Sequence, residues 1–340
     1  MSNNYELSLS CSLETPIEVS SFFSLMEYRN NLFLSKRPDE VVHFFEGFGD
    51  RSDLIEWMKS RPKGRPFLRE VEGLKEIIVI IPTSDIKGKY ATSCRKEIFS
   101  KLHIIFVVSG GVPDPYYNFA HYVNAGIKKA LEYSPKWIII SNDDVYKIDN
   151  ISTLIHELQN LDNDRYDAVF IKPSIYHSTP VIFGPQTIFR KLAFYFSKWR
   201  RAQLRVEKRF GVVFLSSPRV LKRRLFFKQR TFKHTSFGDF FVLSSEFVNG
   251  NNGIIFDETY INGGDDVDFS LRVSCQKLKT AEVNFRIGDY FGMSLGNSVE
   301  RHIRDISGYA YLNFKIQNDL HSASRVMKNY WSELFPSNDE

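Results

Sequence analysis

WIIISNDD, residues 137–144, places an apolar run directly before a group of acidic side chains. Consecutive apolar residues bounded by polar ones are typical of a strand that is buried on both faces. In open α/β sheets, ligands collect at the carboxyl ends of such strands. Asn142, Asp143 and Asp144 are therefore candidate ligands for a hard divalent cation, which prefers oxygen donors. The same residues would also suit an Asx turn or a helix N-cap, so this stretch alone leaves both interpretations open.

Apolar runs and helical patterns alternate on both sides of this stretch. Further strands are predicted at 77–81, 103–108 and 168–171, and amphipathic helices at 118–133 and 151–161. Strands that alternate with helices at this spacing form βαβ units with right-handed crossovers. The sequence therefore predicts an α/β fold with a parallel central sheet flanked by helices.

Two other segments depart from this alternation. Residues 1–75 carry helix-start signals, such as Asp39 and Asp53 ahead of apolar residues, and predict a mainly helical N-terminal extension. Residues 190–233 contain fifteen Lys and Arg residues against one acidic residue, Glu207. A segment of that charge predicts an anionic neighbour.

Within the basic segment, apolar residues recur at three or four residue steps between Leu192 and Phe210. This spacing predicts a basic amphipathic helix inserted into the α/β domain. Such a helix could lie on an anionic membrane surface, or it could pack its apolar face on its own domain. Both interpretations stay open, whereas nucleic acid is an unlikely partner because no nucleic-acid-binding motif accompanies the charge.

Composition narrows the class of protein. The chain has 340 residues, 43% of them hydrophobic and 15% aromatic, which suffices for a packed core in one large or two modest domains. Its three cysteines, Cys11, Cys94 and Cys275, lie far apart and suggest neither a disulfide framework nor a zinc site. No run approaches the ~20 apolar residues of a membrane span. We therefore expect a cytoplasmic protein, with peripheral attachment to the inner membrane face as an option.

A second acidic cluster, GGDDVD, occupies residues 263–268 just before another helical pattern. Crowded carboxylates are tolerated at a helix N-terminus, and their repulsion can raise the pKa of one of them into the range of a general base. The glycine pair predicts a loop that passes close to a ligand, so Asp265 and Asp266 are the candidates for chemistry. Asp268 is expected to be a structural cap.

Several motifs in this order resemble family 2 glycosyltransferases with the GT-A fold. They are IIVIIPT at 77–83, the helix pattern at 118–130, IISNDDV at 139–145, GDFFV at 238–242, FDE at 256–258 and DDVDFSLR at 265–272. The resemblance implies a Rossmann-like architecture with a mixed, mostly parallel central sheet flanked by helices. The resemblance covers about residues 77–294, interrupted by the basic segment. It implies an inverting, metal-dependent transfer of a sugar from a nucleotide diphosphate-sugar donor to a hydroxyl of a glycan or lipid-linked acceptor.

The resemblance also implies a division of the chain. Residues 76–185 would form the nucleotide-sugar half and 236–300 the acceptor half of the GT-A domain. The basic insertion at 186–235 would separate them, and a C-terminal helical segment would cover 301–340.

Individual roles follow from the same resemblance. Asp266 matches the position of the catalytic base, and Asp265 would help to position the base or the acceptor. Asp144 and Asp289 would hold Mn²⁺ or Mg²⁺, with His302 as the alternative to Asp289. The remaining matches would contact the donor: Pro82, Thr83, Ser84, Asp85, Asn124, Asn142, Asp143 and Asp239.

Three positions depart from the family pattern. Asn142 replaces the usual first aspartate, Asp289 stands where the family has a histidine, and Ser109 begins a Ser-Gly-Gly stretch where the family has a base-binding aspartate. These departures leave a non-catalytic GT-A-like protein that binds an anionic polymer or a membrane surface as the alternative. A nucleotidyltransferase is the third candidate, but no glycine-rich, basic phosphate loop follows Ile81.

Overall fold

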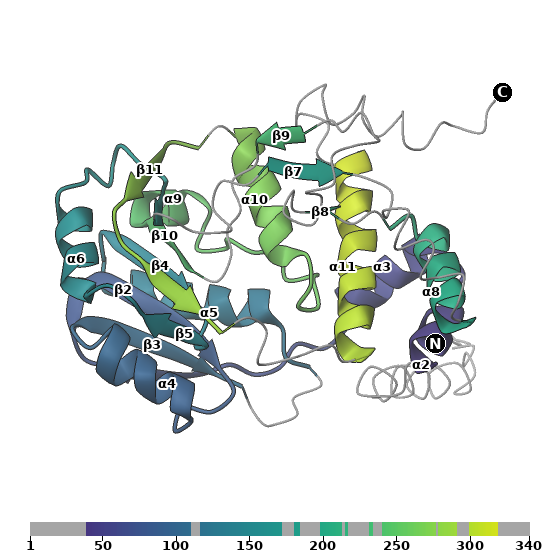
Figure 1. Cartoon of the computed structure of the whole chain (residues 1–340), viewed down its shortest axis with the longest axis horizontal. Coiled ribbons are helices and arrows are strands. Elements are labelled where there is room, and N and C mark those ends of the chain that lie inside the picture. Colours follow the sequence, from purple (N-terminus) through teal and green to yellow (C-terminus); the bar gives the residue numbers. More distant parts are fainter. Residues whose placement is uncertain are drawn as a thin grey trace, which may run out of the picture.

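The structure is a computed structural model with an α/β part and a helical part (Figure 1). The residues it describes are 39–109, 116–171, 180–183, 198–212, 215–216, 231–233, 240–276, 278–290 and 299–318. Asp239 and much of the basic segment lie outside these residues.

In the described residues a seven-stranded sheet has the order β1-β3-β2-β4-β10-β6-β11. Five of the strands run in one direction, whereas β1 and β10 are antiparallel to their neighbours. The predicted mixed, mostly parallel sheet is therefore confirmed. The strands are β1 (Phe67–Val71), β2 (Leu74–Thr83), β3 (Leu102–Val108), β4 (Trp137–Ser141), β6 (Ala168–Ile171), β10 (Phe240–Ser244) and β11 (Thr280–Val283).

Helices cover both faces of this sheet, because the central strands are apolar on both sides. In β2, Ile77, Val79 and Ile81 pack on one face, and Ile78 and Ile80 pack on the other. The first face is covered by α4 (Lys89–Ser93), the π-helical turn η1 (Cys94–Ile98) and α6 (Ile151–Gln159). The second is covered by α5 (Phe119–Leu131), α9 (Ser245–Gly250) and α10 (Asp265–Gln276).

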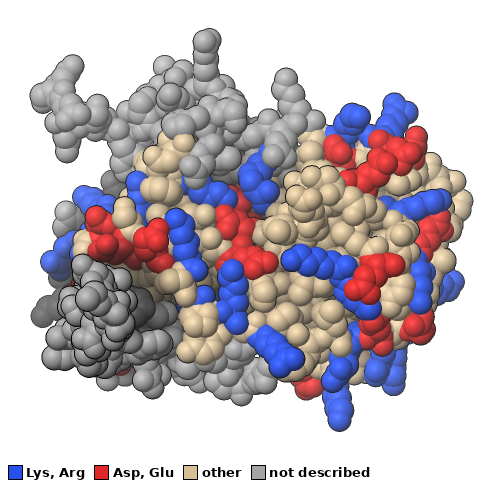
Figure 2. Space-filling view, turned by 180° about the vertical axis from the view of Figure 1, so that it is seen from behind, with Lys and Arg blue, Asp and Glu red and all other residues tan. Residues whose placement is uncertain are grey.

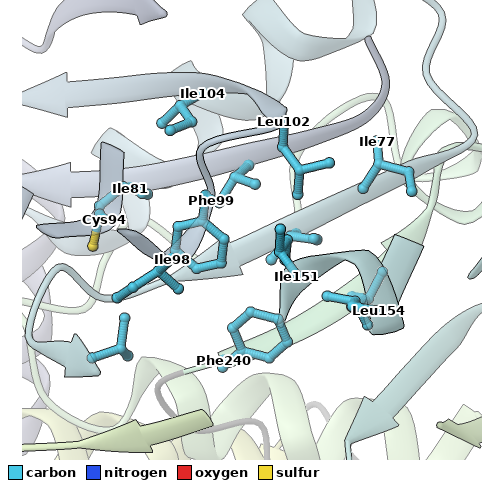
Figure 3. Packing of buried hydrophobic residues seen from close by; sticks show 14 of the residues in the cluster. Ile77, Ile81, Cys94, Ile98, Phe99, Leu102, Ile104, Ile151, Leu154 and Phe240 are labelled. Atoms are coloured by element: carbon cyan, nitrogen blue, oxygen red, sulfur yellow. The ribbon is translucent and has the colours of Figure 1, made fainter. Parts of the chain in front are cut away.

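Figure 3 shows the packing on the first face. Side chains from η1, including Cys94 and Ile98, lie against strand residues such as Ile81 and Phe240. All four are at most 3% exposed. The apolar runs recognised in the sequence thus fill a continuous core, and polar groups are left to the strand ends.

The strand order reverses at β2, where open α/β sheets form a ligand-binding crevice. From β2 the chain continues to β3 on one side, and after β3 it crosses to β4 on the other side of β2. Where the strand order reverses in this way, the loops at the carboxyl ends of the two strands diverge and leave room for a ligand. The residues after β2 and β4 therefore flank the natural binding position of this sheet.

Two smaller sheets accompany the central one. β5 (Val145–Lys147) follows the acidic triplet directly and pairs antiparallel with β12 (Ile287–Asp289). β7 (Pro180–Phe183) pairs with β8 (Leu215–Ser216) and β9 (Thr231–Lys233). The region predicted as a basic helical insertion therefore also contains short strands.

A helical core forms the second part of the molecule (Figure 1). It consists of the buried apolar residues of α2 (Glu40–Glu46), α3 (Arg51–Ser60), α8 (Lys198–Arg209) and α11 (Val299–Asn318), with the loops that adjoin them. Asp50 caps α3 by accepting from the backbone N–H groups of Ser52 and Asp53. The helices expected near Asp39 and Asp53 are confirmed. None of the described helices has the length and apolarity needed to cross a bilayer.

The apolar face of the basic helix α8 packs against the helical core of the protein. Val206 and Phe210, just past its end, are at most 7% exposed, and the Phe210 ring centroid lies 5.4 Å from that of Phe45. Arg209 donates hydrogen bonds to the carbonyl oxygens of Phe48 and Gly49. Of the two interpretations of this helix, packing on its own domain is the one that these contacts favour. Any membrane attachment through α8 would rest on charge alone.

Charge is mixed on one face of the described residues (Figure 2). Figure 2 shows acidic and basic side chains next to one another on the face seen from behind. Such a surface does not present one sign of charge to a partner, in contrast to the composition of residues 190–233.

The N-terminal extension differs from the prediction at one place. Residues Phe67–Val71, expected within a mainly helical segment, form β1 and pair with β3 at the edge of the sheet. Its side chains are only partly buried, so the strand lacks the apolar run that marks a central strand. Charged residues such as Arg69 and Glu70 are typical of an edge, where they discourage pairing with other chains.

The helix α11 packs closely against the loop before α10, because glycines at the contact let the two backbones approach each other. A β-carbon at Gly308 would overlap the carbonyl oxygen of Gly263, and one at Gly263 would lie 2.8 Å from the carbonyl oxygen of Arg304. Gly264 has φ of +85°, a conformation that favours glycine. The glycine pair was expected to pass close to a ligand, but its close neighbour in the structure is the backbone of α11.

We predict that Gly308→Ala lowers the free energy of unfolding by about 1–3 kcal/mol, because the added methyl group forces the helix away from Gly263. In an unconstrained helix the same change would stabilise. Gly250→Ala is the control, since nothing lies within 4 Å of its β-carbon position. Urea denaturation measures both variants, and equal stability of Gly308→Ala and the unchanged protein would contradict the prediction.

Candidate active site

The candidate site begins where β2 and β4 end, side by side. Thr83, the last residue of β2, donates a hydrogen bond from its hydroxyl to Oδ2 of Asp143 at 2.6 Å. β4 ends at Ser141, and the half-buried Asn142 follows at the start of the same turn. The structure thus brings the first predicted donor loop against the acidic triplet.

The loop after β2 is held by turn hydrogen bonds. The hydroxyl of Thr83 accepts from the backbone N–H of Asp85 at 3.3 Å, and Oδ1 of Asp85 accepts from the N–H of Lys87 at 2.9 Å. Pro82 and Thr83 are buried, whereas Ser84 and Asp85 are exposed at the mouth of the crevice. Of this group, Ser84 and Asp85 have the side chains that a ligand can reach.

Asp143 and Asp144 are held in a poorly solvated position. Burial is the main cause that raises the pKa of Asp143, against the hydrogen bond from Thr83. Burial also raises the pKa of Asp144, and the negative charges of Asp143 and Asp289 raise it further. Two carboxylates this close repel each other when both are ionised. A cation bound between them would remove that repulsion.

Asp289 reaches this position through the β5–β12 ribbon. It pairs with Val145 in the ribbon register, and the backbone N–H of Tyr290 donates to the carbonyl oxygen of Asp144 at 2.9 Å. Asp144 and Asp289, which are far apart in sequence, are therefore neighbours, as the predicted metal site requires.

The donor set fits a hard cation that shares its ligands with a substrate. Mg²⁺ commonly takes one or two carboxylates and completes its shell with water and phosphate oxygens. In the described residues no group of three His, Cys, Asp or Glu side chains is arranged to hold a metal ion. His302 therefore does not join Asp144 and Asp289 in such a group, and the carboxylate pair would be the protein's contribution.

The second acidic cluster lies in the first turn of α10. Burial raises the pKa of both Asp265 and Asp266, and the charge of Asp266 raises that of Asp265 further. Asp265 is only 7% exposed, and its Oδ2 atom is buried without a hydrogen-bond partner among the described residues. For Asp266 the nearby charge of Asp305 in α11 adds to the effect of burial. These shifts bring the pair toward the range in which a carboxylate accepts a proton efficiently.

Asp268, the third member of the cluster, is part of a buried ion network. Its Oδ2 atom lies 2.9 Å from Nε of Arg272, and its Oδ1 atom lies 2.8 Å from Nζ of Lys315. Lys315 also contacts Asp257 at 2.9 Å and helps to lower the pKa of that carboxyl to about 2 against the effect of burial. These contacts agree with the structural role expected for Asp268, and they fasten α11 to α10.

Tyr117 links the two acidic groups. Burial raises its pKa most, and the charges of Asp265 and Asp143 raise it further, whereas Arg304 lowers it. Its carbonyl oxygen accepts from the side chain of Asn262 at 3.1 Å, which ties it to the loop before α10. The donor-side and acceptor-side carboxylates thus approach the same tyrosine, although more than a hundred residues separate them in the chain.

The sequence did not point to Tyr117 or to the contribution of α11. Arg304 acts on Tyr117, and Asp305 and Tyr309 interact electrostatically with Asp266. The only signal available was the aromatic pair that ends at Tyr117, directly before the Asn118 cap of α5. Nothing in the helical pattern of 301–340 indicates that it packs beside the second acidic cluster.

Asn124 has a different environment from the one expected of a donor ligand. It is 1% exposed, and its Nδ2 atom donates to the carbonyl oxygen of Phe256 and to Oε1 of Glu258 at 2.9 and 3.0 Å. Its Oδ1 atom accepts from the N–H groups of Ile255 and Phe256. The side chain holds α5 to the loop before α10, and its contact with a donor stays a prediction.

No protein-family model and no curated protein sequence matches the chain. What the protein does is therefore inferred from the positions and chemistry of its own residues.

We predict that Asp265→Asn stabilises the protein at alkaline pH and not at acidic pH. Its pKa is raised by burial to about 7, from about 3.9 in an unfolded chain. Folding therefore favours the protonated form, so the stability that Asp265 contributes below pH 4 is lost as pH rises through 7. Asparagine avoids this loss.

Thermal unfolding at pH 5 and at pH 8.5 measures the effect of Asp265→Asn. The exposed Asp164 supplies the control variant Asp164→Asn. A gain in Tm that is the same at both pH values would contradict the assigned cause.

Proposed function

We propose that this protein is an inverting, metal-dependent glycosyltransferase with a GT-A fold, which moves a sugar from a nucleotide diphosphate-sugar to an acceptor hydroxyl. One observation carries the proposal: Asp143, bonded to Thr83 at the end of β2, and Asp265, at the start of α10, are poorly solvated carboxylates that both raise the pKa of Tyr117. Transfer of this kind needs positive charge for the departing diphosphate at one end and a base at the other.

The fold supports the proposal. The crevice between the ends of β2 and β4 lies where open α/β sheets bind ligands. The antiparallel strand β10 lies between β4 and β6, so its first residue, Phe240, pairs with Ser141 at the same edge. A mixed sheet of this order is compatible with the Rossmann-like architecture that the GT-A fold represents.

At the donor end, Asp144 and Asp289 would hold the cation. A bound Mn²⁺ or Mg²⁺ would neutralise the charge that develops on the leaving diphosphate. Thr83 fixes the orientation of Asp143 by its hydrogen bond, and the exposed Ser84 and Asp85 are available to the nucleotide.

At the acceptor end, Asp266 would act as the base. The acceptor oxygen attacks the anomeric carbon, the bond from that carbon to the diphosphate oxygen breaks, and the hydroxyl proton passes to the Asp266 carboxylate. A single displacement inverts the anomeric centre. Burial favours the neutral acid as the product of the step, because it raises the pKa of Asp266. Asp265, buried beside it, would position the base, and the acceptor would be a glycan or a lipid-linked saccharide.

We predict that Asp144→Ala abolishes metal-dependent donor binding. The unchanged protein should gain thermal stability from a nucleoside diphosphate together with Mn²⁺, because a ligand that binds only the folded state raises Tm. A scan of uridine, guanosine and adenosine diphosphates with and without Mn²⁺ makes the measurement. The Asp164→Ala variant, altered at an exposed position, should keep the gain. An equal, metal-dependent gain in Asp144→Ala would exclude the assigned metal site.

We predict that Asp266→Asn lowers the transfer rate by about 10²-fold or more, the usual contribution of a general base. Donor binding should persist, because Asp266 lies in the other acidic group. A screen of nucleotide sugars for transfer or slow hydrolysis first identifies the donor, and the calorimetric affinity of that donor then serves as the control. In the unchanged enzyme the rate should fall as pH drops below about 6, where Asp266 becomes protonated. Near-normal turnover by Asp266→Asn would exclude it as the base.

A further inference from the structure

Three tyrosines from separate segments converge beside the proposed metal ligands. Tyr90 lies in α4, Tyr146 in β5, and Tyr290 directly after β12. The ring centroid of Tyr290 lies 5.7 Å from that of Tyr90 and 5.0 Å from that of Tyr146. Tyr146 is 38% exposed and Tyr290 45% exposed, so their rings form an open aromatic surface. We call these three residues the tyrosine platform.

The ribbon is built to hold the platform in place. Tyr146 pairs with Gly288 across the ribbon, and a β-carbon at Gly288 would overlap the Tyr146 ring. Glycine at this position lets the ring lie across the strand. The N–H of Tyr290 is bonded to the carbonyl oxygen of Asp144, which fixes the platform relative to the carboxylate pair. Its outer surface is left uncovered, although covering such rings would contribute to stability.

The platform and the proposed base lie on opposite sides of the strand ends. Val145 and Ile287 of the ribbon pack with the core on the α4 face of the sheet. Tyr117 and Phe269 of α10 pack with the core on the α5 face. Asp143 and Asp144 follow β4 at the strand ends: Asp143 accepts a hydrogen bond from Thr83 at the end of β2, and the carbonyl oxygen of Asp144 accepts one from the N–H of Tyr290.

This arrangement matches the order of groups in a nucleotide sugar, in which the diphosphate lies between the sugar and the nucleoside. In an inverting displacement the base lies on the side of the sugar ring opposite to the leaving group. With Asp266 at one end and the diphosphate at Asp144 and Asp289, the nucleoside must continue toward the α4 face. The tyrosine platform is the aromatic surface at that place, and heterocyclic bases stack on such rings.

We propose that the tyrosine platform binds the base of the donor nucleotide by stacking. The inference rests on the proposed function, and it names the subsite that recognises the nucleoside. It also accounts for Ser109 in the position where a base-binding aspartate was expected. Because every base has an aromatic face, stacking alone discriminates weakly, and nucleoside diphosphates with different bases bind with similar affinity.

Calorimetric titration of the full chain in Mn²⁺ tests the proposal, with uridine diphosphate, guanosine diphosphate and inorganic pyrophosphate as ligands. Tyr90→Ala and Tyr146→Ala should weaken both nucleotides about 5- to 100-fold, the usual contribution of one stacked base. Pyrophosphate, which has no base, should bind all variants equally. Tyr146→Phe keeps the ring and should retain nucleotide affinity.

Tyr133→Ala is the matched control, because this tyrosine packs against His103 at the start of β3 and bonds to Glu70, away from the strand ends. Its affinity for the nucleotides should equal that of the unchanged protein. Circular dichroism shows whether Tyr146→Ala keeps the ribbon, and Tyr90→Ala, outside the ribbon, tests stacking without altering it.

The outcomes separate this inference from the function on which it rests. Unchanged nucleotide affinity in Tyr90→Ala and Tyr146→Ala, or an equal loss for pyrophosphate, would overturn the platform alone. A strong preference of the unchanged protein for one base would overturn recognition by stacking alone. Absence of Mn²⁺-dependent binding of pyrophosphate and of every nucleotide would overturn the proposed function as well.

Discussion

Burial of β2 and β4 on both faces is the constraint on which the rest of the structure depends. Every residue of β4 is buried, and β2 is buried from Ile77 to Thr83. Polar side chains therefore find space only where these strands end. Thr83 and Asp143 occupy those ends and bond to each other across them. The position of the candidate site is thus a consequence of how the apolar core is arranged.

The candidate site stores charge repulsion that the rest of the molecule must offset. Asp265 is buried with an unbonded carboxylate oxygen, and Asp144 lies close to two other carboxylates. Lys315 supplies part of the compensation by binding Asp257 and Asp268 together. Removing one member of such a buried network leaves an uncompensated charge. Natural proteins often retain unfavourable charge of this kind where function requires it.

Much of the architecture follows from sequence patterns. The apolar runs at 77–81 and 137–140 became β2 and β4, and the helix expected at 118–133 became α5, with Asn118 as its N-cap. Periodicity is informative there because burial on two faces, or on one face of a helix, leaves a clear pattern. The edge strand β1 has no such pattern, since solvent reaches it on more than one side.

Fewer features of the candidate site could be predicted from the sequence. Composition and order pointed to the acidic clusters, but the neighbour of an acidic group is decided by tertiary packing. Asp289 reaches Asp144 through the ribbon, and Arg304 reaches Tyr117 from α11. A glycine pair has the same appearance in sequence whether it approaches a ligand or, as at Gly263, another backbone. Such close approaches leave no periodic signal.

The helical core has a consequence for how the chain is made. Phe44 and Trp57 belong to α2 and α3, and Phe48 lies in the loop between them, whereas α11, which packs on them, follows more than two hundred residues later in the chain. This core is therefore completed only by a distant segment, which is a demanding step in folding. The same late helix also braces Gly263 and the loop that precedes Asp265. The loop that carries the second acidic cluster can therefore take its final position only after α11 has been synthesised.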